Sequence, residues 1–366
     1  MIEEVLKEAD KILKERNQKT SIENFLFKEK LSPYELLILL LDDNDENLYL
    51  MAEVSKKITE RYFGKVINLF TPLYLSNYCT CGCSYCGFSM ENRNLKRIKL
   101  NEEEILKELK TIKSFGIDSI LLLTGCDMIN TPFEYILSGV KIAKDMFSEV
   151  AVEVYSLKEE EYKILAQNGL TGVTQYQETY NKEVYDKLHP YGPKRDYYYR
   201  LYTQERALKG GVKEVTLGVL LGLNDPIEDV FKMILHAEYL MKKFPNAEIN
   251  VSFPRFRPAG TNFKESFKIT DKMMLRFIFS ARIYLKNVGI PLSTRENSKF
   301  RDALIGYGIT KMSAGSKTCV GGYSKEYYSG NQFENEDKRS VEEIIEVIKR
   351  KGYRPEFTNW VKGVVA

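Results

Sequence analysis

The sequence predicts an α/β fold, a (βα)8 TIM barrel, on two observations. From residue 66 onward, short apolar segments of strand type alternate with longer segments of helical periodicity, and this alternation is typical of a parallel sheet covered by helices. Eight such units fall within about 250 residues, the usual length of a (βα)8 barrel. A doubly wound open sheet is the alternative arrangement of the same elements.

The predicted strands are short apolar runs, and most of them lead into polar or glycine-containing segments. They cover residues 66–75, 119–124, 150–154, 172–177, 214–221, 249–253, 291–294 and 310–313. Helices are predicted between most of them. Asn101 and Glu104 form a capping box, and Ile105, Leu109 and Ile112 follow at helical spacing. Further helices are predicted over 159–165, 227–242 and 271–285.

We expect three regions along the chain. Residues 1–60 form a helical N-terminal extension, because apolar residues recur at helical spacing from Ile2 and a second apolar helix opens at Ser32–Pro33. Residues 61–325 form the barrel. Residues 326–366 form a C-terminal extension with an amphipathic helix over 340–351.

The composition excludes several classes of function. The 366 residues carry a formal net charge of +3, whereas nucleic-acid-binding proteins usually concentrate a strong basic excess on one face. No apolar run reaches the length of a membrane span, and the acidic residues 1–5 lack the apolar core of a signal peptide. We therefore expect a cytoplasmic protein with reduced thiols that binds neither nucleic acid nor a membrane.

Four of the six cysteines lie close together, at Cys79, Cys81, Cys83 and Cys86. Clustered thiolates usually indicate a metal site. A structural zinc ion bound by all four is one interpretation, although closed zinc sites usually draw ligand pairs from two separate hairpins. We favour Cys79, Cys83 and Cys86 as ligands of a [4Fe–4S] cluster, with Cys81 as a bystander; the alternative is that Cys81 replaces Cys79 or Cys83 as a ligand. Three thiolates would leave the fourth iron open to a substrate or cofactor.

The unusual polar clusters of the sequence nearly all follow a predicted strand. In a (βα)8 barrel, the C-terminal ends of the strands surround the active site. Besides the cysteine loop, the clusters are 124–126, 176–180, 252–258, 293–296 and 313–316. Their joint placement predicts a single active site at this end of the barrel.

The spacing of Cys79, Cys83 and Cys86, followed by Gly87 and Phe88, resembles the signature of radical S-adenosylmethionine (SAM) enzymes. Other segments are similar to the aromatic amino acid lyases of that superfamily, namely 70–79, 176–180, 252–255, 292–296, 312–318 and 321–323. The resemblance covers about residues 30–360 and points to the 2-iminoacetate synthase (ThiH) family, the tyrosine lyases of thiamine synthesis.

This resemblance implies that the barrel is of the radical SAM type, and it implies a reaction and its cofactors. A [4Fe–4S] cluster reduces SAM, which yields methionine and a 5′-deoxyadenosyl radical. The radical takes a hydrogen from the amino group of L-tyrosine, and the Cα–Cβ bond breaks to give 2-iminoacetate (dehydroglycine) and p-cresol. The resemblance also implies a flavodoxin- or ferredoxin-type electron donor, and a thiazole synthase working alongside the enzyme.

The family's substrate-binding residues have matches at the strand ends. Arg295 matches the arginine that holds the substrate carboxylate, a task that suits a planar guanidinium, and Ser313 matches a serine that assists it. The alternative for Arg295 is a structural ion pair with the neighbouring Glu296. Arg255 and Arg257 are further candidates, although arginines also brace barrel rims.

The resemblance also indicates the SAM pocket. Tyr85 lies where the family places an aromatic ring beside the adenine, and Thr124 and Gly125 lie in the loop beside the methionine amine. Polar SAM groups are expected near Glu153, Glu178 and Arg200, each of which could instead be a barrel-rim residue. Of the two histidines, His236 is expected to be structural, and His189 could gate the site.

One departure from the family bears on function. Cys126 follows Gly125 where relatives usually carry Glu, beside the SAM amine. The change leaves open a paralogue acting on another amino acid, and a zinc-stabilised barrel without catalytic activity is the third hypothesis. The sister family, the tyrosine lyase that matures [FeFe]-hydrogenase, carries further cluster cysteines in an additional C-terminal domain. Only Cys319 follows Cys126 here, so we expect no conversion of dehydroglycine to cyanide and carbon monoxide.

Overall fold

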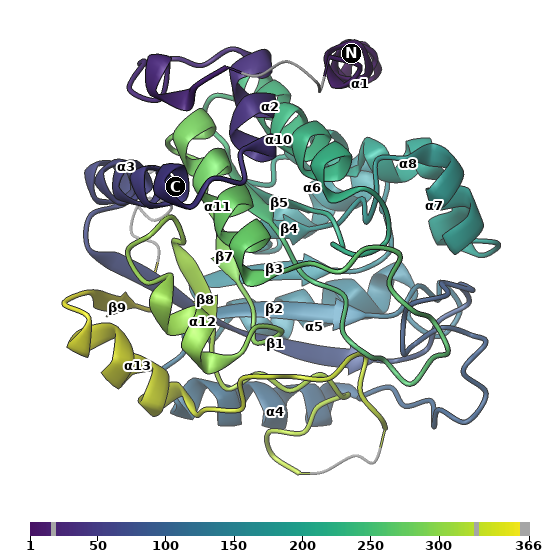
Figure 1. Cartoon of the computed structure of the whole chain (residues 1–366). Helices are drawn as coiled ribbons and strands as arrows, with labels where there is room; N and C mark the ends of the chain where they lie inside the picture. Colours follow the sequence, from purple (N-terminus) through teal and green to yellow (C-terminus); the bar gives the residue numbers. More distant parts are fainter. Residues whose placement is uncertain (16–19, 326–328, 359–366) are drawn as a thin grey trace.

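The strands follow one another around a nearly closed parallel barrel, with helices on its outside (Figure 1). This computed structural model describes residues 1–15, 20–325 and 329–358. The first strand, β1 (Val66–Ser76), lies between β2 (Ser119–Thr124) and β8 (Lys311–Ser313). The order continues from β2 to β6 without reversal, so the predicted (βα)8 barrel is confirmed and the doubly wound alternative is wrong.

The barrel closes between β6 and β7 through a single point of contact. The strands between β2 and β8 are β3 (Glu149–Glu153), β4 (Gly172–Thr174), β5 (Glu214–Gly218), β6 (Glu248–Ser252) and β7 (Pro291–Leu292). Just before β7, the Gly289 amide donates to Ile249 O and the Gly289 carbonyl accepts from Val251 N, both at 2.9 Å. A Cβ atom on Gly289 would lie 1.7 Å from Asn250 Oδ1, so this closure requires glycine.

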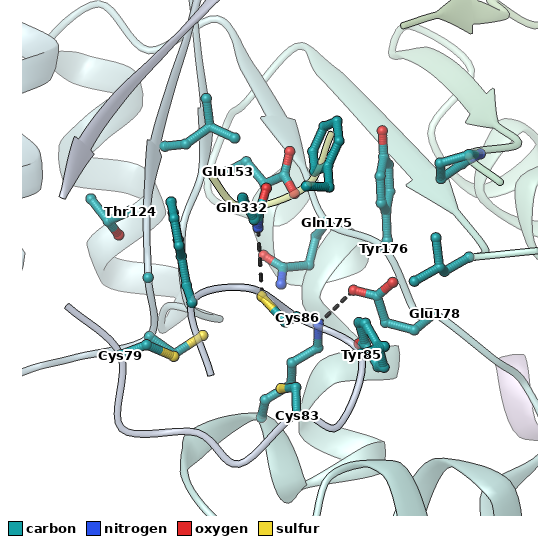
Figure 2. Close-up of a pocket in the computed structure, with 18 of the residues that line it drawn as sticks. Cys79, Cys83, Tyr85, Cys86, Thr124, Glu153, Gln175, Tyr176, Glu178 and Gln332 are labelled. Carbon is teal, nitrogen blue, oxygen red and sulfur yellow. Dashed lines mark hydrogen bonds and ion pairs between the residues drawn. The ribbon is translucent and has the colours of Figure 1, made fainter. Parts of the chain in front are cut away.

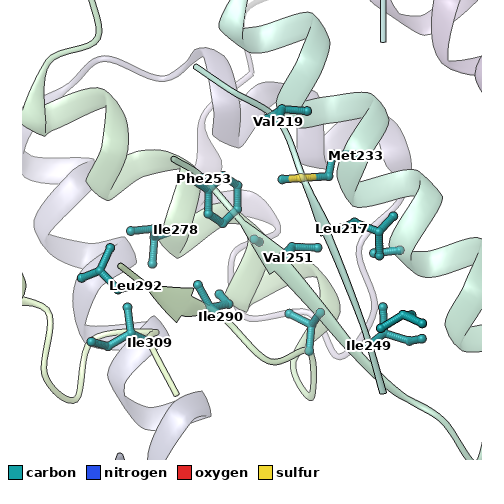
Figure 3. Close-up of a cluster of buried hydrophobic side chains, with 14 of the residues drawn as sticks. Leu217, Val219, Met233, Ile249, Val251, Phe253, Ile278, Ile290, Leu292 and Ile309 are labelled. Carbon is teal, nitrogen blue, oxygen red and sulfur yellow. The ribbon is translucent and has the colours of Figure 1, made fainter. Parts of the chain in front are cut away.

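Helices cover the barrel because their apolar faces meet the outward-facing residues of the strands. They are α4 (Glu102–Ser114), α5 (Phe133–Lys144), α6 (Glu159–Gln167), α7 (Lys182–Leu188), α8 (Tyr197–Leu201), α9 (Thr203–Lys209), α10 (Pro226–Lys243), α11 (Asp271–Leu285) and α12 (Ser298–Ala303). Figure 3 shows this packing next to the closure point, where Met233 of α10 and Ile278 of α11 join Val251 of β6 in the core. All three side chains are fully buried.

The N-terminal segment forms a second helical layer. Its helices α1 (Ile2–Leu13), α2 (Pro33–Leu41) and α3 (Asp45–Phe63) pack on α10 and α11, and Lys232 of α10 forms an ion pair with Asp10 at 2.6 Å. The helices expected within residues 1–60 are therefore present, while the division of the chain into three domains stays a prediction. None of the helices in the described ranges is long and apolar enough to cross a membrane.

The C-terminal segment returns to the first strand. After the expected amphipathic helix α13 (Val341–Arg350), the short strand β9 (Arg354–Glu356) pairs in parallel with Val66–Asn68 of β1. We did not predict β9, because three residues with alternating charge carry no strand pattern. Three predicted strands are also too long. The segments 175–177, 219–221 and 293–294 lie beyond the ends of β4, β5 and β7. In the first two segments, single hydrogen bonds and bridges to the neighbouring chain continue beyond the regular ladder.

A buried ion pair joins this C-terminal segment to the barrel. Arg301 of α12 is fully buried and donates to Asp337 and to Ser313 O, and Asp337 is 2% exposed. Asp337 also accepts from Arg339 at 2.7 Å.

Replacing Asp337 with alanine should therefore lower the free energy of unfolding by about 3–5 kcal/mol, because the buried Arg301 charge would lose its partner. The control is Asp186→Ala, which removes the half-exposed pair Lys182–Asp186 and should cost less than about 1 kcal/mol. Urea unfolding followed by circular dichroism measures both variants. Equal losses in the two would contradict a structural role for the buried pair.

Candidate active site

A cavity lies at the C-terminal ends of the strands, where the sequence predicts the active site (Figure 2). Its free volume is about 100 Å³, which is smaller than the roughly 300–1,000 Å³ usual for a small-molecule site. Most of the predicted site residues line it, namely Cys79, Cys83, Tyr85, Cys86, Thr124, Gly125, Glu153, Glu178, Arg200, Arg257 and Arg295. Arg255 and Ser313 do not.

The cysteine loop is fixed by close backbone contacts with the loop after β2. The pairing of β1 with β2 is irregular between Tyr74 and Ser76, immediately before the cysteine loop, and such irregularities are common beside active sites. The Thr80 amide and hydroxyl both donate to Cys126 O, at 2.9 and 2.8 Å. A Cβ atom on Gly125 would lie 2.2 Å from Tyr78 O. The two loops can therefore touch only because residue 125 is glycine.

The four clustered cysteines do not point the same way. Cys79, Cys83 and Cys86 line the cavity, whereas Cys81 is fully buried outside its lining and its Sγ accepts a hydrogen bond from Lys194 N at 3.4 Å. Burial raises the pKa of the Cys86 thiol to about 12, so metal binding there releases a proton. Within the described ranges, no three Cys, His, Asp or Glu side chains converge on a point that a single metal ion could occupy.

A buried acid lies between two cations on the cavity wall. Glu178 has a left-handed backbone conformation, with φ of 71°, and its Oε1 lies 2.5 Å from Lys194 Nζ and 3.4 Å from Arg200 Nη2. Burial alone would raise the pKa of Glu178, but Lys194 and Arg200 hold it below its usual value. The carboxylate is therefore ionised and preorganised. Sequence reasoning missed Lys194, because its contact with Glu178 joins residues 16 positions apart and leaves no local pattern.

The three arginines near the cavity differ in their partners. Glu296 forms ion pairs with Arg255 and Arg257, and these two arginines also pair with Asp271 and Glu336. The alternative expectation, a pair between Arg295 and Glu296, is therefore wrong.

Arg295 keeps its charge available to the cavity. Its guanidinium lies 3.4 Å from the centroid of the Phe333 ring, and no hydrogen bond or ion pair to the guanidinium occurs in the described part of the chain. Ser313 affects Arg295 indirectly, because its hydroxyl accepts a hydrogen bond at 3.1 Å from the amide of Thr294, the residue before Arg295.

The C-terminal segment supplies cavity residues that the sequence did not reveal as site residues. Gln332 accepts from the Tyr74 hydroxyl at 2.6 Å, and its amide nitrogen lies 3.9 Å from Cys86 Sγ (Figure 2). A Cβ atom on Gly87 would lie 2.6 Å from Gln332 O, so this segment lies directly against the cysteine loop. Such contacts between distant parts of the chain leave no local pattern to detect.

Three further groups give the cavity its chemical character. Burial, together with the nearby Glu178 charge, raises the pKa of Glu153 to about 7. The hydroxyl of Thr124 is buried without a hydrogen-bond partner in the described ranges and is available to a ligand. Cys126 is only partly buried and also lines the cavity.

Comparison with known proteins agrees with this geometry. Residues 73–237 match the radical SAM superfamily, and residues 252–354 match the biotin and thiamin synthesis associated domain. The chain is 33% identical to 2-iminoacetate synthase of Escherichia coli over 94% of its own length and 92% of that protein. It is also similar to the hydrogenase maturase HydG of Carboxydothermus hydrogenoformans, with a TM-score of 0.91, 33% identity, and coverage of 98% of this chain and 86% of that chain.

The chain belongs to the radical SAM superfamily, in the group of 2-iminoacetate synthases and HydG maturases. It is a radical SAM enzyme, and its cofactors are a [4Fe–4S] cluster and SAM. The site fits both groups: Cys79, Cys83 and Cys86 line one cavity, with the buried Cys81 side chain packed beside them, and the polar wall contains ionised and unpaired groups that a zwitterionic ligand could engage.

The raised pKa of Glu153 predicts that the free energy of unfolding of the cluster-free protein falls as pH rises. A carboxyl group whose pKa is higher in the folded state loses stability as pH rises from its unfolded value, near 4.5, through about 7. Glu153→Gln should therefore gain about 1–3 kcal/mol relative to the wild type between pH 4.5 and pH 7.5. Urea unfolding at a series of pH values tests this, and parallel stability curves for the two proteins would contradict it.

Proposed function

We propose that this enzyme cleaves the Cα–Cβ bond of L-tyrosine to give 2-iminoacetate and p-cresol, with SAM converted to 5′-deoxyadenosine and methionine. The product would supply the thiazole of thiamine. The observation that carries the proposal is the presence of the Arg295 guanidinium, without a counter-ion in the described chain, in the same cavity as Cys79, Cys83 and Cys86. The similarity to 2-iminoacetate synthase supports the choice of substrate.

Cys79, Cys83 and Cys86 would hold the cluster. When bound, the cluster supplies the electron that cleaves SAM, and three protein ligands leave one iron open to SAM. Cys81 is the least suited of the four, because its side chain is fully buried and lies outside the cavity lining.

The polar wall would bind SAM. Glu178 is held ionised by Lys194 and Arg200 and suits ribose hydroxyls, which donate to a carboxylate. Lys194 and Arg200 suit the methionine carboxylate, Tyr85 forms a ring wall for the adenine, and the Thr124–Gly125 loop accepts from the amine. Because its pKa is raised to about 7, the Glu153 carboxyl group can face the ligand in its neutral form near pH 7.

Arg295 would bind the substrate carboxylate, because a guanidinium offers two parallel donors to a carboxylate. Phe333 stacks on this guanidinium and fixes its plane. Ser313 would assist by holding the Thr294 amide, next to Arg295. Arg255 and Arg257 are engaged by acids, so a bracing role fits them better than substrate binding.

The rest of the cavity wall excludes water. Tyr74, Phe88 and Leu123 form a buried apolar cluster beside Cys79 and Cys86, and the rings of Tyr74 and Phe88 meet edge to face at 5.6 Å. A reactive radical would abstract hydrogen from other donors, so a dry, closed wall protects the reaction.

The enzyme would act in the cytoplasm with a flavodoxin- or ferredoxin-type electron donor and alongside a thiazole synthase. Cys126 favours one alternative, a paralogue acting on another amino acid, because a thiol lines the cavity where the family carries a carboxylate.

The protein should form p-cresol and 5′-deoxyadenosine in equal amounts when the reconstituted enzyme receives SAM, dithionite and tyrosine without oxygen. Mass spectrometry detects both products, and omission of tyrosine is the control. Deoxyadenosine without p-cresol would contradict the tyrosine lyase and favour another amino acid. Neither product from a protein with a full cluster would contradict the proposed chemistry altogether.

Single substitutions should separate the three ligands from the bystander. Cys79→Ala, Cys83→Ala and Cys86→Ala should each lose most of the bound iron and the visible absorbance of the cluster after reconstitution. Cys81→Ala is the matched control and should keep both, because its thiol lies outside the cavity lining. Iron analysis decides the matter, and loss of iron in Cys81→Ala with retention in one of the other three would overturn this assignment.

A further inference from the structure

The chain has two histidines, and the imidazole of each forms a 2.8 Å hydrogen bond with a tyrosine hydroxyl. His189 pairs with Tyr85, and His236 pairs with Tyr180. Both imidazoles are buried and both ring pairs meet edge to face. The pairs differ in place: Tyr85 lines the active-site cavity, whereas His236 lies on α10 and neither it nor Tyr180 lines the cavity.

The hydrogen bonds of His189 fix its tautomer. Its Nδ1 lies 2.8 Å from the carbonyl oxygen of Tyr185, and a carbonyl can only accept, so Nδ1 carries the proton. Burial holds the pKa of His189 well below its usual value, so the ring is neutral. Nε2 is then a bare acceptor, and the Tyr85 hydroxyl must donate to it.

The end of α7 holds two successive residues of the cysteine loop. The carbonyl of Leu188 accepts from the Ser84 amide at 3.2 Å, and the His189 side chain accepts from Tyr85. The backbone contact fixes where the loop passes, and the side-chain contact fixes the ring that projects from it.

The Tyr85 ring has further contacts on the cavity side. The Lys194 ammonium lies 5.4 Å from the ring centroid and is itself bound to Glu178, and the Phe263 ring meets Tyr85 edge to face at 6.3 Å. The hydrogen bond to His189 anchors the hydroxyl end of the ring, which also interacts with the Lys194 ammonium. Without this hydrogen bond, the ring could turn about its side-chain bonds and the buried His189 acceptor would be left without a partner.

We propose that His189 is a positioning residue that acts through the Tyr85 hydroxyl to hold the Tyr85 ring in the wall of the SAM site. This inference rests on the proposed function only in taking the cavity beside Tyr85 as the place where the adenine of SAM binds. It goes beyond that function because it gives a residue outside the cavity lining a part in cofactor affinity.

The test measures the dissociation constant of SAM by anaerobic equilibrium dialysis on cluster-reconstituted protein of matched iron content. His189→Leu and Tyr85→Phe should each weaken SAM binding about tenfold, the order expected when one buried hydrogen bond is lost. The double variant should bind no more weakly than either single variant, because both remove the same bond.

Two further variants separate positioning from general stability. His189→Gln can still accept from Tyr85 and donate to the Tyr185 carbonyl, so it should bind SAM within about threefold of the wild type. His236→Leu removes the matched pair away from the cavity and should leave the SAM affinity unchanged, although it destabilises the fold. Should His189→Leu fail to fold, Tyr85→Phe and His189→Gln carry the test.

The outcomes distinguish this inference from the proposed function. Wild-type SAM affinity in Tyr85→Phe and His189→Leu, or equal weakening in His236→Leu, would overturn the positioning role even if the wild type makes p-cresol. Weaker SAM binding in the two variants, from a wild type that makes no p-cresol, would support the positioning role and contradict tyrosine as the substrate. A reconstituted wild type that binds no SAM would overturn both.

Discussion

The active site depends on close backbone contact around the cysteine loop. Gly125 touches the loop at Tyr78, Gly87 of the loop touches Gln332, and Gly192 touches Cys81, each at a distance that a side chain would block. Three segments from different parts of the chain therefore enclose one short loop. This enclosure buries Cys81 against Gly192 and Lys194 and leaves Cys79, Cys83 and Cys86 in the cavity lining.

The charged residues at the cavity rim form ion pairs that brace the strand ends and leave the Arg295 cation available. Glu296 is buried and engages two arginines, whereas Arg295 has an aromatic ring as its partner. The position of Glu296 decides the roles of the three arginines. Arg255 and Arg257 pair with it and brace the strand ends, and Arg295 remains available to a ligand. A similar division holds deeper in the cavity, where Glu178 binds Lys194 and Arg200 together and fixes their positions.

The sequence predicted the parts of this molecule that local pattern controls. Alternating strands and helices gave the barrel, and the spacing of Cys79, Cys83 and Cys86 indicated the thiols that face the cavity. The sequence could not predict pairings between distant residues. Glu296 was expected beside Arg295 because they are neighbours in sequence, yet it turns toward Arg255. Lys194 and Gln332 reach the site through contacts with residues far away along the chain, and β9 has no strand pattern of its own.

The pairing of β9 with β1 has a consequence for the order of assembly. The strand that leads into the cysteine loop takes partners from β8 and β9, near the opposite end of the chain. Contacts of such long sequence separation form late and slow folding. During synthesis, the first half of the barrel would leave the ribosome with β1 unpaired along one edge and the cysteine loop uncovered by the segment that contains Gln332.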